Sequence, residues 1–566
     1  MVDLRVPSSL LVLLAGVGLA IAVPATAQEE VSPAACEDPV RLVPESLESV
    51  DAMLRRLPSL DAEVDAPDRT WSTAASLGRT PLCGEAPWLD GWTADAALVT
   101  SGLRALPAHA RLTGTTAWPV ERANGLQWTG KGLSGTLRGG VSYRSGALTL
   151  ELRPELAFAE NRPYAVYDTL LVDRDRYAYP WHARRIDWPQ RHGDESLVWL
   201  GPGESRLALD LGAVELALSS EQVVWGPSLA YPLLLGPSAP GVPHLSLSTL
   251  RGLRLGGLGT LRGQLLWGLL DESDHFDDDG DNDRRLLSGI VVSFRPSVFP
   301  GFSVGAASLV HSDASDLQAG DLWAFLQTPT EGEDSEGNVS GNGLGSLFAH
   351  WAVPGSGFEA WVEWGRDDYS FDTNDLLSEP DHTQAWSAGV QQVARWGADG
   401  LVRFSGELTH LTNEEPRIQD DSPRSRNASF YTHAFLRQGH THRGQLLGSP
   451  VGPGSDAQRV ALDLLQAGRL WGLSLERVRW DDDAYVRSLS PVGGSDGHDV
   501  ELTLGLRHAR PLGALRLHLE ADAQLRRNRL WADFSQQADA EGVEPGFGWA
   551  RNLRVEAAVS WMPGRR

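Results

Sequence analysis

The chain has 566 residues, of which 42% are hydrophobic, and it carries a formal net charge of −25. A mean hydropathy of −0.23 excludes a bundle of transmembrane helices, and the strong acidity excludes a basic nucleic-acid-binding surface. A transmembrane β-barrel fits both numbers, because only every second residue of a barrel strand faces lipid. The 60 glycines and 21 tryptophans suit the turns and aromatic girdles of such a barrel, although a soluble, secreted β-rich protein remains an alternative.

Residues 1–27 are typical of a secretory signal peptide. Arg5 precedes an apolar run over residues 10–23, and Ala25-Thr26-Ala27 forms an A-x-A cleavage signal. We therefore expect cleavage before Gln28 and export of the mature chain.

The first part of the mature chain, residues 28–118, has a different pattern from the rest. Residues 45–57 and 94–106 have apolar side chains at helical spacing, and each run is followed by a proline. The two cysteines, Cys36 and Cys83, are predicted to form a disulfide bond in an oxidising compartment, with two free thiols as the alternative. We expect a small helical subdomain here, on the periplasmic side of the membrane.

From about residue 132 the hydrophobic pattern alternates with a period of two, as in β-strands. The clearest stretch has one apolar face, made of Leu515, Leu517, Leu519, Ala521, Ala523 and Leu525. Its other face is polar, made of Arg516, His518, Glu520, Asp522, Gln524 and Arg526. Residues 119–566 are thus predicted to form an all-β transmembrane barrel of about 18 antiparallel strands, with long polar loops at one end.

One of these loops, residues 271–285, is very acidic. Asp277, Asp279, Asp281 and Asp283 alternate around a glycine and offer hard oxygen ligands that could hold Ca²⁺. The spacing does not match an EF-hand, so the alternative is a solvated acidic loop. Acidic polymers would be repelled by such loops unless divalent cations bridge them or local arginine clusters override the charge.

Two proline- and glycine-rich stretches must leave the barrel wall, because proline cannot donate to a sheet ladder. The first, residues 221–250, contains Trp225-Gly226-Pro227. The Trp225 ring could stack on a sugar, or it could be a packing anchor for a loop folded into the lumen. The second stretch, residues 431–454, contains Arg443, which could bind a uronate or phosphate or form an internal salt bridge.

At these stretches the chain resembles the Wzi-type capsule-assembly proteins of the Gram-negative outer membrane. The matching residues are Trp225-Gly226-Pro227, Tyr431, His442-Arg443-Gly444-Gln445, Gly452-Pro453-Gly454 and Arg162-Pro163-Tyr164. The resemblance implies an 18-stranded barrel with a small periplasmic helical bundle that tethers exported capsular polysaccharide at the cell surface. Ser228 departs from the pattern, which has a glycine there.

The sequence therefore predicts an outer-membrane protein that attaches capsular polysaccharide or exopolysaccharide to the cell surface. The candidate polysaccharide-binding residues are Trp225, Tyr431, His442 and Arg443, and the candidate loop-structuring residues are Gly226, Pro227, Gly444, Gly452 and Pro453. We expect a monomer that contacts outer-membrane lipid and the barrel-insertion machinery, with no cofactor and no enzymatic activity. The alternatives are a porin or solute channel and an outer-membrane enzyme acting on lipid or glycan.

Overall fold

The computed structural model describes most of the chain after residue 100. The described residues are 53, 57, 69–73, 92, 101–120, 124–166, 175–182, 185–249, 252–277, 282–315, 317–326, 341–367, 383–413, 429–486, 497–531 and 549–562. The predicted signal peptide, Cys36, Cys83, Asp279 and Asp281 lie outside the described residues, and so does nearly all of the helix predicted over 45–57.

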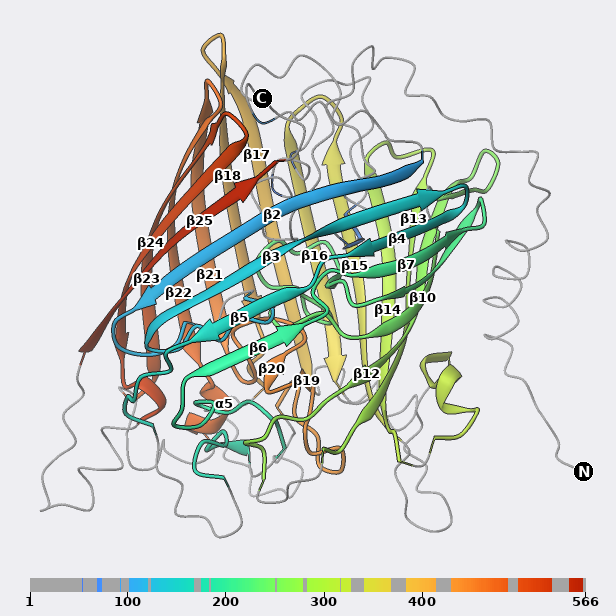
Figure 1. The fold of residues 1–566 in the computed structure, drawn as a ribbon. Helices are drawn as coiled ribbons and strands as arrows, with labels where there is room; N and C mark the ends of the chain where they lie inside the picture. Colours follow the sequence, from blue (N-terminus) through green and yellow to red (C-terminus); the bar gives the residue numbers. More distant parts are fainter. Residues whose placement is uncertain are drawn as a thin grey trace, which may run out of the picture.

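Within the described residues, an antiparallel β-barrel of 18 wall positions closes on itself (Figure 1), which confirms the predicted fold class. The first and last wall strands, β2 (Gly102–Thr115) and β25 (Trp549–Trp561), pair with each other and close the ring. Among these residues, no helix is long and apolar enough to cross a membrane.

After β2 and the 14-residue β3 (Gly132–Ser145), the next wall strands are short, and three wall positions are each built from two segments. These strands are β4 (Leu148–Leu152) with β5 (Glu155–Ala159), β6 (Leu197–Gly201) with β7 (Arg206–Asp210), β8 (Val214–Ser219), and β10 (His244–Thr249) with β11 (Leu253–Arg254). Breaks in the wall therefore gather on one side of the barrel, which faces the viewer in Figure 1.

The remaining wall strands are continuous. They are β12 (Gly259–Leu270), β13 (Arg285–Pro296), β14 (Phe302–Asp313), β15 (Asn342–Val353), β16 (Phe358–Asp367), β17 (Gln384–Trp396), β18 (Gly400–His410), β21 (Asp456–Gln466), β22 (Arg469–Trp480), β23 (Asp499–Leu512) and β24 (Leu515–Arg527). The short elements off the wall are β1 (Trp71–Thr73), β9 (Val223–Trp225), β19 (Thr441–His442), β20 (Gln445–Leu446), α5 (Asp482–Ala484) and the 3₁₀ helices η4 (Asp321–Leu326) and η8 (Arg529–Trp531).

Strand β24 has the two faces that its sequence predicts. On the apolar face, Leu515 and Leu519 are about 40% exposed on the outside of the barrel. On the polar face, Arg526 donates two hydrogen bonds of 2.7 Å to Asp499, and Asp522 accepts one of 2.9 Å from Arg554. The leucines therefore face lipid, and the charged residues pair across the lumen wall.

The helix predicted over residues 94–106 is wrong for residues 102–106, which belong to β2. The register between β2 and β3 shifts between Leu106 and His109, as at a β-bulge, and Pro107 lies in this irregular step. Leu103 and Leu106 both precede this step and lie on opposite faces of the strand, with Leu103 70% exposed and Leu106 buried, so one apolar residue on each face produces a helix-like spacing of three. The barrel consequently begins before the predicted domain boundary at residue 118.

The two ends of the barrel differ. Tight turns such as residues 146–147, 397–399 and 513–514 join strands at one end, whereas residues 160–196, 220–243 and 411–455 are long connections at the other. We call the latter the long-loop end; it carries α5, β19 and β20 and lies at the bottom of Figure 1. Because outer-membrane barrels have short periplasmic turns, the long-loop end faces the outside of the cell.

Tryptophans mark both edges of the lipid-facing band. Strand β25 has 13 residues and ends in Trp549 and Trp561, whose side chains are 52% and 45% exposed. At about 3.3 Å per residue and a tilt of about 40°, such a strand spans roughly 30 Å, the thickness of a bilayer core. Its length and aromatic ends fit a membrane-spanning strand.

Candidate functional site

Three chain segments meet inside the barrel: residues 69–73, 220–243 and 429–455, which we call the plug. Strand β1 pairs with β9, with Trp71 opposite Trp225, and the Gly226 N–H donates to Thr70 O at 2.9 Å. The other two segments are joined by a hydrogen bond of 2.7 Å from Gly236 N to Leu447 O. The described residues thus fill the lumen with chain from three distant parts of the sequence.

Trp225 lies at the centre of the plug and is 0% exposed. Its indole Nε1 donates to Gln264 Oε1 on β12 at 2.8 Å, so its polar group is paired inside the barrel. No face of the ring is open to a sugar. This burial fits the alternative role of Trp225 as a packing anchor, and a contact between Trp225 and polysaccharide stays a prediction.

The residues after Trp225 explain the Gly-Pro sequence and the unusual serine. Gly226 has a φ of 94°, and a Cβ there would lie 2.4 Å from the Glu363 carboxylate, so only glycine fits. Ser228 donates to Glu407, which also accepts hydrogen bonds from the backbone N–H groups of residues 229–231. The serine therefore adds an anchor to a turn that a carboxylate on β18 holds in place.

Tyr431 is also fully buried, and its contact with polysaccharide stays a prediction. Its hydroxyl donates to Leu233 O at 2.6 Å and accepts from Ser449 N at 2.9 Å. It thereby joins residues 220–243 to both ends of its own loop. His440 adds a second link, with its Nε2 2.5 Å from Leu234 O.

The other predicted loop-structuring residues lie in the plug. Gly444 and Gly452 have φ values of 73° and 77°, and a Cβ on Gly452 would lie 2.7 Å from the Trp188 ring. Pro227 and Pro453 are buried, and Pro453 O accepts from the Ser455 hydroxyl at 3.1 Å. These positions are consistent with the predicted role in shaping the loops.

His442 and Arg443 lie where the plug meets the end of β12. His442 is 1% exposed, and its Nδ1 accepts a hydrogen bond of 3.0 Å from Asp271 N, so it cannot reach a surface polymer. Burial and the charge of Arg443 lower the pKa of His442 to about 3, which keeps the ring neutral and able to accept.

Arg443 matches the alternative prediction of a salt bridge, but it is also accessible. Its Nε and NH2 groups lie 3.1 and 2.9 Å from one oxygen of Asp271, and Arg284 Nε lies 3.2 Å from the other oxygen. The side chains of Arg443 and Arg284 are 45% and 64% exposed. Two exposed arginines thus share one carboxylate at the surface.

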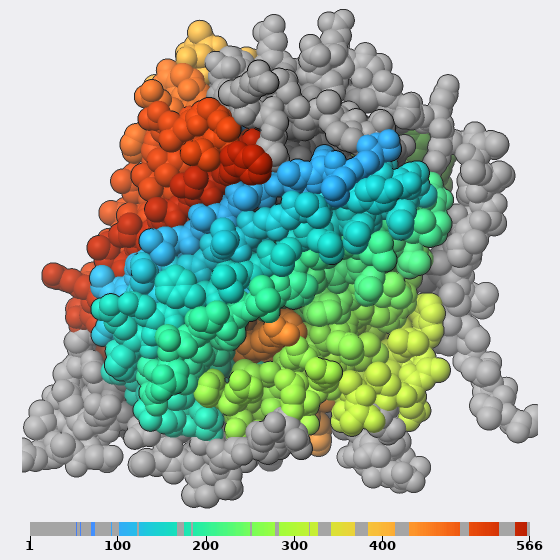
Figure 2. Space-filling model, in the orientation of Figure 1, coloured from blue at the N-terminus to red at the C-terminus, as the bar shows by residue number. Residues whose placement is uncertain are grey.

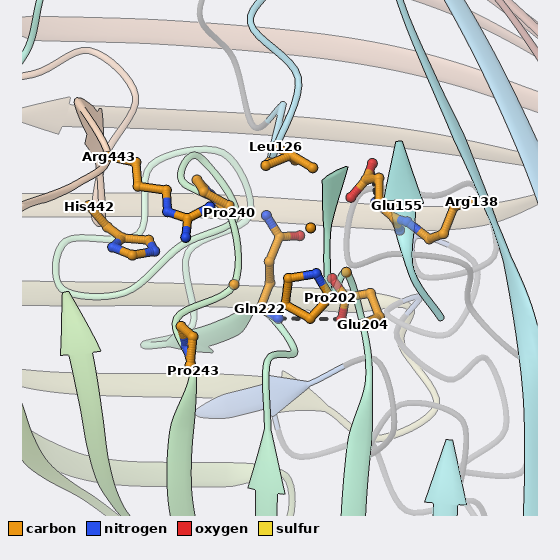
Figure 3. A pocket seen from close by; sticks show the side chains of 14 residues that line it. Leu126, Arg138, Glu155, Pro202, Glu204, Gln222, Pro240, Pro243, His442 and Arg443 are labelled. Atoms are coloured by element: carbon orange, nitrogen blue, oxygen red, sulfur yellow. Dashed lines mark hydrogen bonds and ion pairs between the residues drawn. The ribbon is translucent and has the colours of Figure 1, made fainter. Parts of the chain in front are cut away.

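A small cavity of about 30 Å³ lies beside Arg443 (Figure 3). Its lining comes from the plug and from the broken part of the wall, and includes Gln222, Pro240, His442, Arg138, Glu155 and Glu204. The volume is room for about one water molecule and is far too small for a sugar ring.

The tip of the third plug segment is the most exposed part of the plug. Phe435 is 67% exposed and Arg437 is exposed beside it. The base of this tip is held by His433 Nδ1, which accepts from Phe435 N at 3.3 Å and Leu436 N at 2.9 Å. Burial and the nearby Arg185 lower the pKa of His433 to about 4, so the ring stays neutral and keeps this acceptor.

Of the four candidate calcium ligands, the structure describes Asp277 and Asp283. The negative charges of both carboxylates disfavour ionisation of Glu272. Burial raises the pKa of Glu272 to about 7, and the charges of Asp187, Asp277 and Asp283 contribute to this rise. The hydrogen bond from Gln438 opposes this rise. Carboxylates thus gather near this loop, and calcium binding stays a prediction.

Sequence reasoning missed the wall residues that hold the plug. Glu407 and Gln264 both lie on the lumen side of alternating strands, so the period-two pattern marks them as inward-facing. The pairing of β1 with β9 could not be predicted from the sequence, because a three-residue strand is too short to show a period-two pattern.

Comparisons with known proteins agree with this architecture. A model of the family "Capsule assembly protein Wzi" matches residues 133–509. A similar solved structure is Wzi of Escherichia coli, described as an outer-membrane, carbohydrate-binding β-barrel involved in group 1 capsule assembly. It is 11% identical, with a TM-score of 0.54, and the match covers 82% of this chain and 84% of that one.

Two barrels from other families are also similar, at lower scores. OccK7 of Pseudomonas aeruginosa is 10% identical over 81% of this chain and 99% of that chain, with a TM-score of 0.39. OccAB4 of Acinetobacter baumannii is 8% identical over 82% and 98%, with a TM-score of 0.35. No curated protein sequence matches the chain. The family match covers well over half of the sequence, and the chain belongs to the Wzi family of capsule assembly proteins.

Proposed function

We propose that this capsule assembly protein binds exported polysaccharide with its long-loop end and holds it at the cell surface. The observation that carries the proposal is the tip of the plug, where Phe435 and Arg437 project from a base that buried hydrogen bonds fix in place. An exposed aromatic ring can cover the apolar face of a sugar, and an arginine can bind a uronate. The carbohydrate binding described for the E. coli protein of this fold supports the same role.

The proposed mechanism is multivalent capture without chemistry. A long polymer offers many copies of the same sugar, so several weak contacts along it give strong retention. The protein needs no catalytic group and no cofactor for this task, and a monomer is sufficient. Trp225 and Tyr431 contribute indirectly, because they hold the plug from which the tip projects.

The lumen also bears on the porin alternative. A porin needs a continuous aqueous path, whereas the plug packs Trp225, Tyr231 and Leu233 at the centre of this barrel, each at most 1% exposed. The filled lumen of the described residues therefore favours a binding protein over a channel.

The test is retention of surface glycan in a strain that lacks the protein and is complemented with variants. We expect Phe435→Ala combined with Arg437→Ala to release several-fold more polymer into the medium than the unaltered protein does. The matched control is Phe299→Ala, because Phe299 is 63% exposed but lies in a turn at the opposite end of the barrel.

Heat-modifiable migration on gels checks that each variant barrel has assembled. Equal retention by the tip variant and the control would reject the tip as a binding surface. Equal retention with and without the whole protein would reject the proposed function.

A further inference from the structure

The barrel wall has a gap at its long-loop end, between β6 and β12. Strand β6 pairs along one edge with β5, while β8 and β10 have six residues each and end at Ser219 and His244, where the chain turns into the lumen. Among the described residues, no strand bridges β6 and β12 beyond that point. Figure 2 shows the gap from outside: orange atoms, the colour of the plug segment with β19 and β20, are visible through the wall.

The rim of this gap is apolar and faces lipid. Val198 and Leu200 on β6 are 70% and 75% exposed, among the highest values for large apolar side chains on the wall. Across the gap, Leu269 on β12 is 44% exposed. Both sides can therefore lie against acyl chains.

Behind the apolar rim lies a polar floor. The Arg443 side chain lines the cavity of Figure 3, and its backbone N–H donates to Asp271 O at 2.9 Å. Arg284 reaches the same Asp271 carboxylate from the start of β13. Two exposed guanidinium groups that share one carboxylate offer further N–H donors, and such donors suit phosphate oxygens.

The aromatic residues next to the gap indicate the depth of this arginine pair in the membrane. Trp267 faces outward on β12 and contacts Trp323 of η4, with ring centroids 5.8 Å apart. The helix η4 lies on the outer side of the wall, where Ser288 and Ser308 donate to its carbonyl oxygens. Tryptophan girdles sit at the headgroup level, so Leu269 and Asp271, two and four residues beyond Trp267, lie at the level of the lipid headgroups.

We propose that this gap is a lipid-binding site, in which Arg284 and Arg443 hold a phosphate group of an outer-leaflet lipid while the rim of Val198, Leu200 and Leu269 contacts the apolar part of that lipid next to its headgroup. The apolar rim and the headgroup depth favour a lipid over a soluble polymer. The cavity behind the arginines holds about one water molecule, so the ligand stays in the gap and does not enter the lumen. This site is independent of the polysaccharide-binding tip at Phe435.

The test uses the full-length protein in detergent and native mass spectrometry with two probes, bisphosphorylated lipid A and its fully dephosphorylated form. We expect the unaltered protein to retain the phosphorylated lipid at least about tenfold better, since a charge-assisted bond contributes roughly 1.5–3 kcal/mol. Arg284→Gln combined with Arg443→Gln should abolish that preference. The matched control is Arg176→Gln, which changes a 63% exposed arginine that also pairs with one carboxylate.

Three outcomes would overturn the proposal. The first is equal retention of the two lipids by the unaltered protein, and the second is an unchanged preference in the double variant. The third is competition by soluble acidic oligosaccharide with no effect of inorganic phosphate, which would make the arginine pair a glycan site. Arg284→Lys with Arg443→Lys keeps the charge, so it should retain most of the preference and shows that the loop has not collapsed.

Discussion

At the scale of single residues, the positions that the sequence makes conspicuous serve the plug. Trp225 and Tyr431 are aromatic residues next to glycine and proline, a pattern that also suits a sugar-binding surface. In the structure each is buried, and the polar group of each donates a hydrogen bond to another plug or wall residue. The same residue types suit both roles because a large ring with one polar atom packs well and hydrogen-bonds at one edge.

A substitution at Gly226 tests the plug directly. Gly226→Ala places a methyl group 2.4 Å from the Glu363 carboxylate at a φ of 94°, and we expect it to cost roughly 2–3 kcal/mol of plug stability. Faster hydrogen exchange of residues 223–235 is the measurement. Gly146→Ala is the control, because that glycine also has a positive φ but a Cβ there would meet nothing within 4 Å. Equal exchange in the two variants would contradict the clash.

At the scale of elements, strands were predictable and loops were not. The wall strands repeat one pattern, apolar outside and charged inside, which is readable residue by residue. Strand β2 shows the limit, because apolar Leu103 and Leu106 lie on opposite faces and their spacing of three suggests a helix. The loops carry no period, so their positions depend on contacts with distant wall residues such as Glu407.

The acidic loop after β12 should respond to pH. The pKa of Glu272 is about 7 in the folded protein, above its ordinary value of 4.5, so folding favours the protonated form. Its contribution to loop stability is therefore complete below pH 4.5 and is lost as the pH rises through 7. We expect the protection factors of residues 271–277, which compare each exchange rate with the intrinsic rate at the same pH, to be lower at pH 8 than at pH 6.

Two variants and added calcium make this pH test more specific. Glu272→Gln mimics the protonated side chain and should remove the pH difference, whereas Glu195→Gln, at an exposed carboxylate, should leave it. Calcium added at pH 8 should slow the exchange if Asp277 and Asp283 help to bind it. A pH difference that survives in Glu272→Gln would show that another group is responsible.

At the scale of the whole molecule, the barrel encloses segments of its own chain in its lumen. Closing 18 strands leaves a lumen wide enough for water, and the plug fills it with segments from three parts of the sequence. The purified protein should therefore show no large, steady conductance in planar bilayers.

Removing one plug segment should open a path. Ser219 and His244 are paired neighbours on β8 and β10, so a tight Asn-Gly turn can replace residues 220–243 without straining the wall. We expect conductance to rise at least about tenfold in this variant, because barrels of this size without a plug conduct. The control replaces the two turn residues 212–213 with Asn-Gly, which keeps Leu211 opposite Val214. Conductance in that control or silence in the variant would contradict the role of the plug.

The sequence by itself determined the barrel, its approximate strand number and its membrane orientation, because these follow from alternation and loop length, which are local properties. Its motifs also identified the family. Only the tertiary structure decided that Trp225 and Tyr431 are buried, that residues 69–73 complete the plug, and that Arg284 and Arg443 meet at a gap in the wall. Those facts depend on contacts between residues far apart in the chain, and such contacts leave no periodic signal in the sequence.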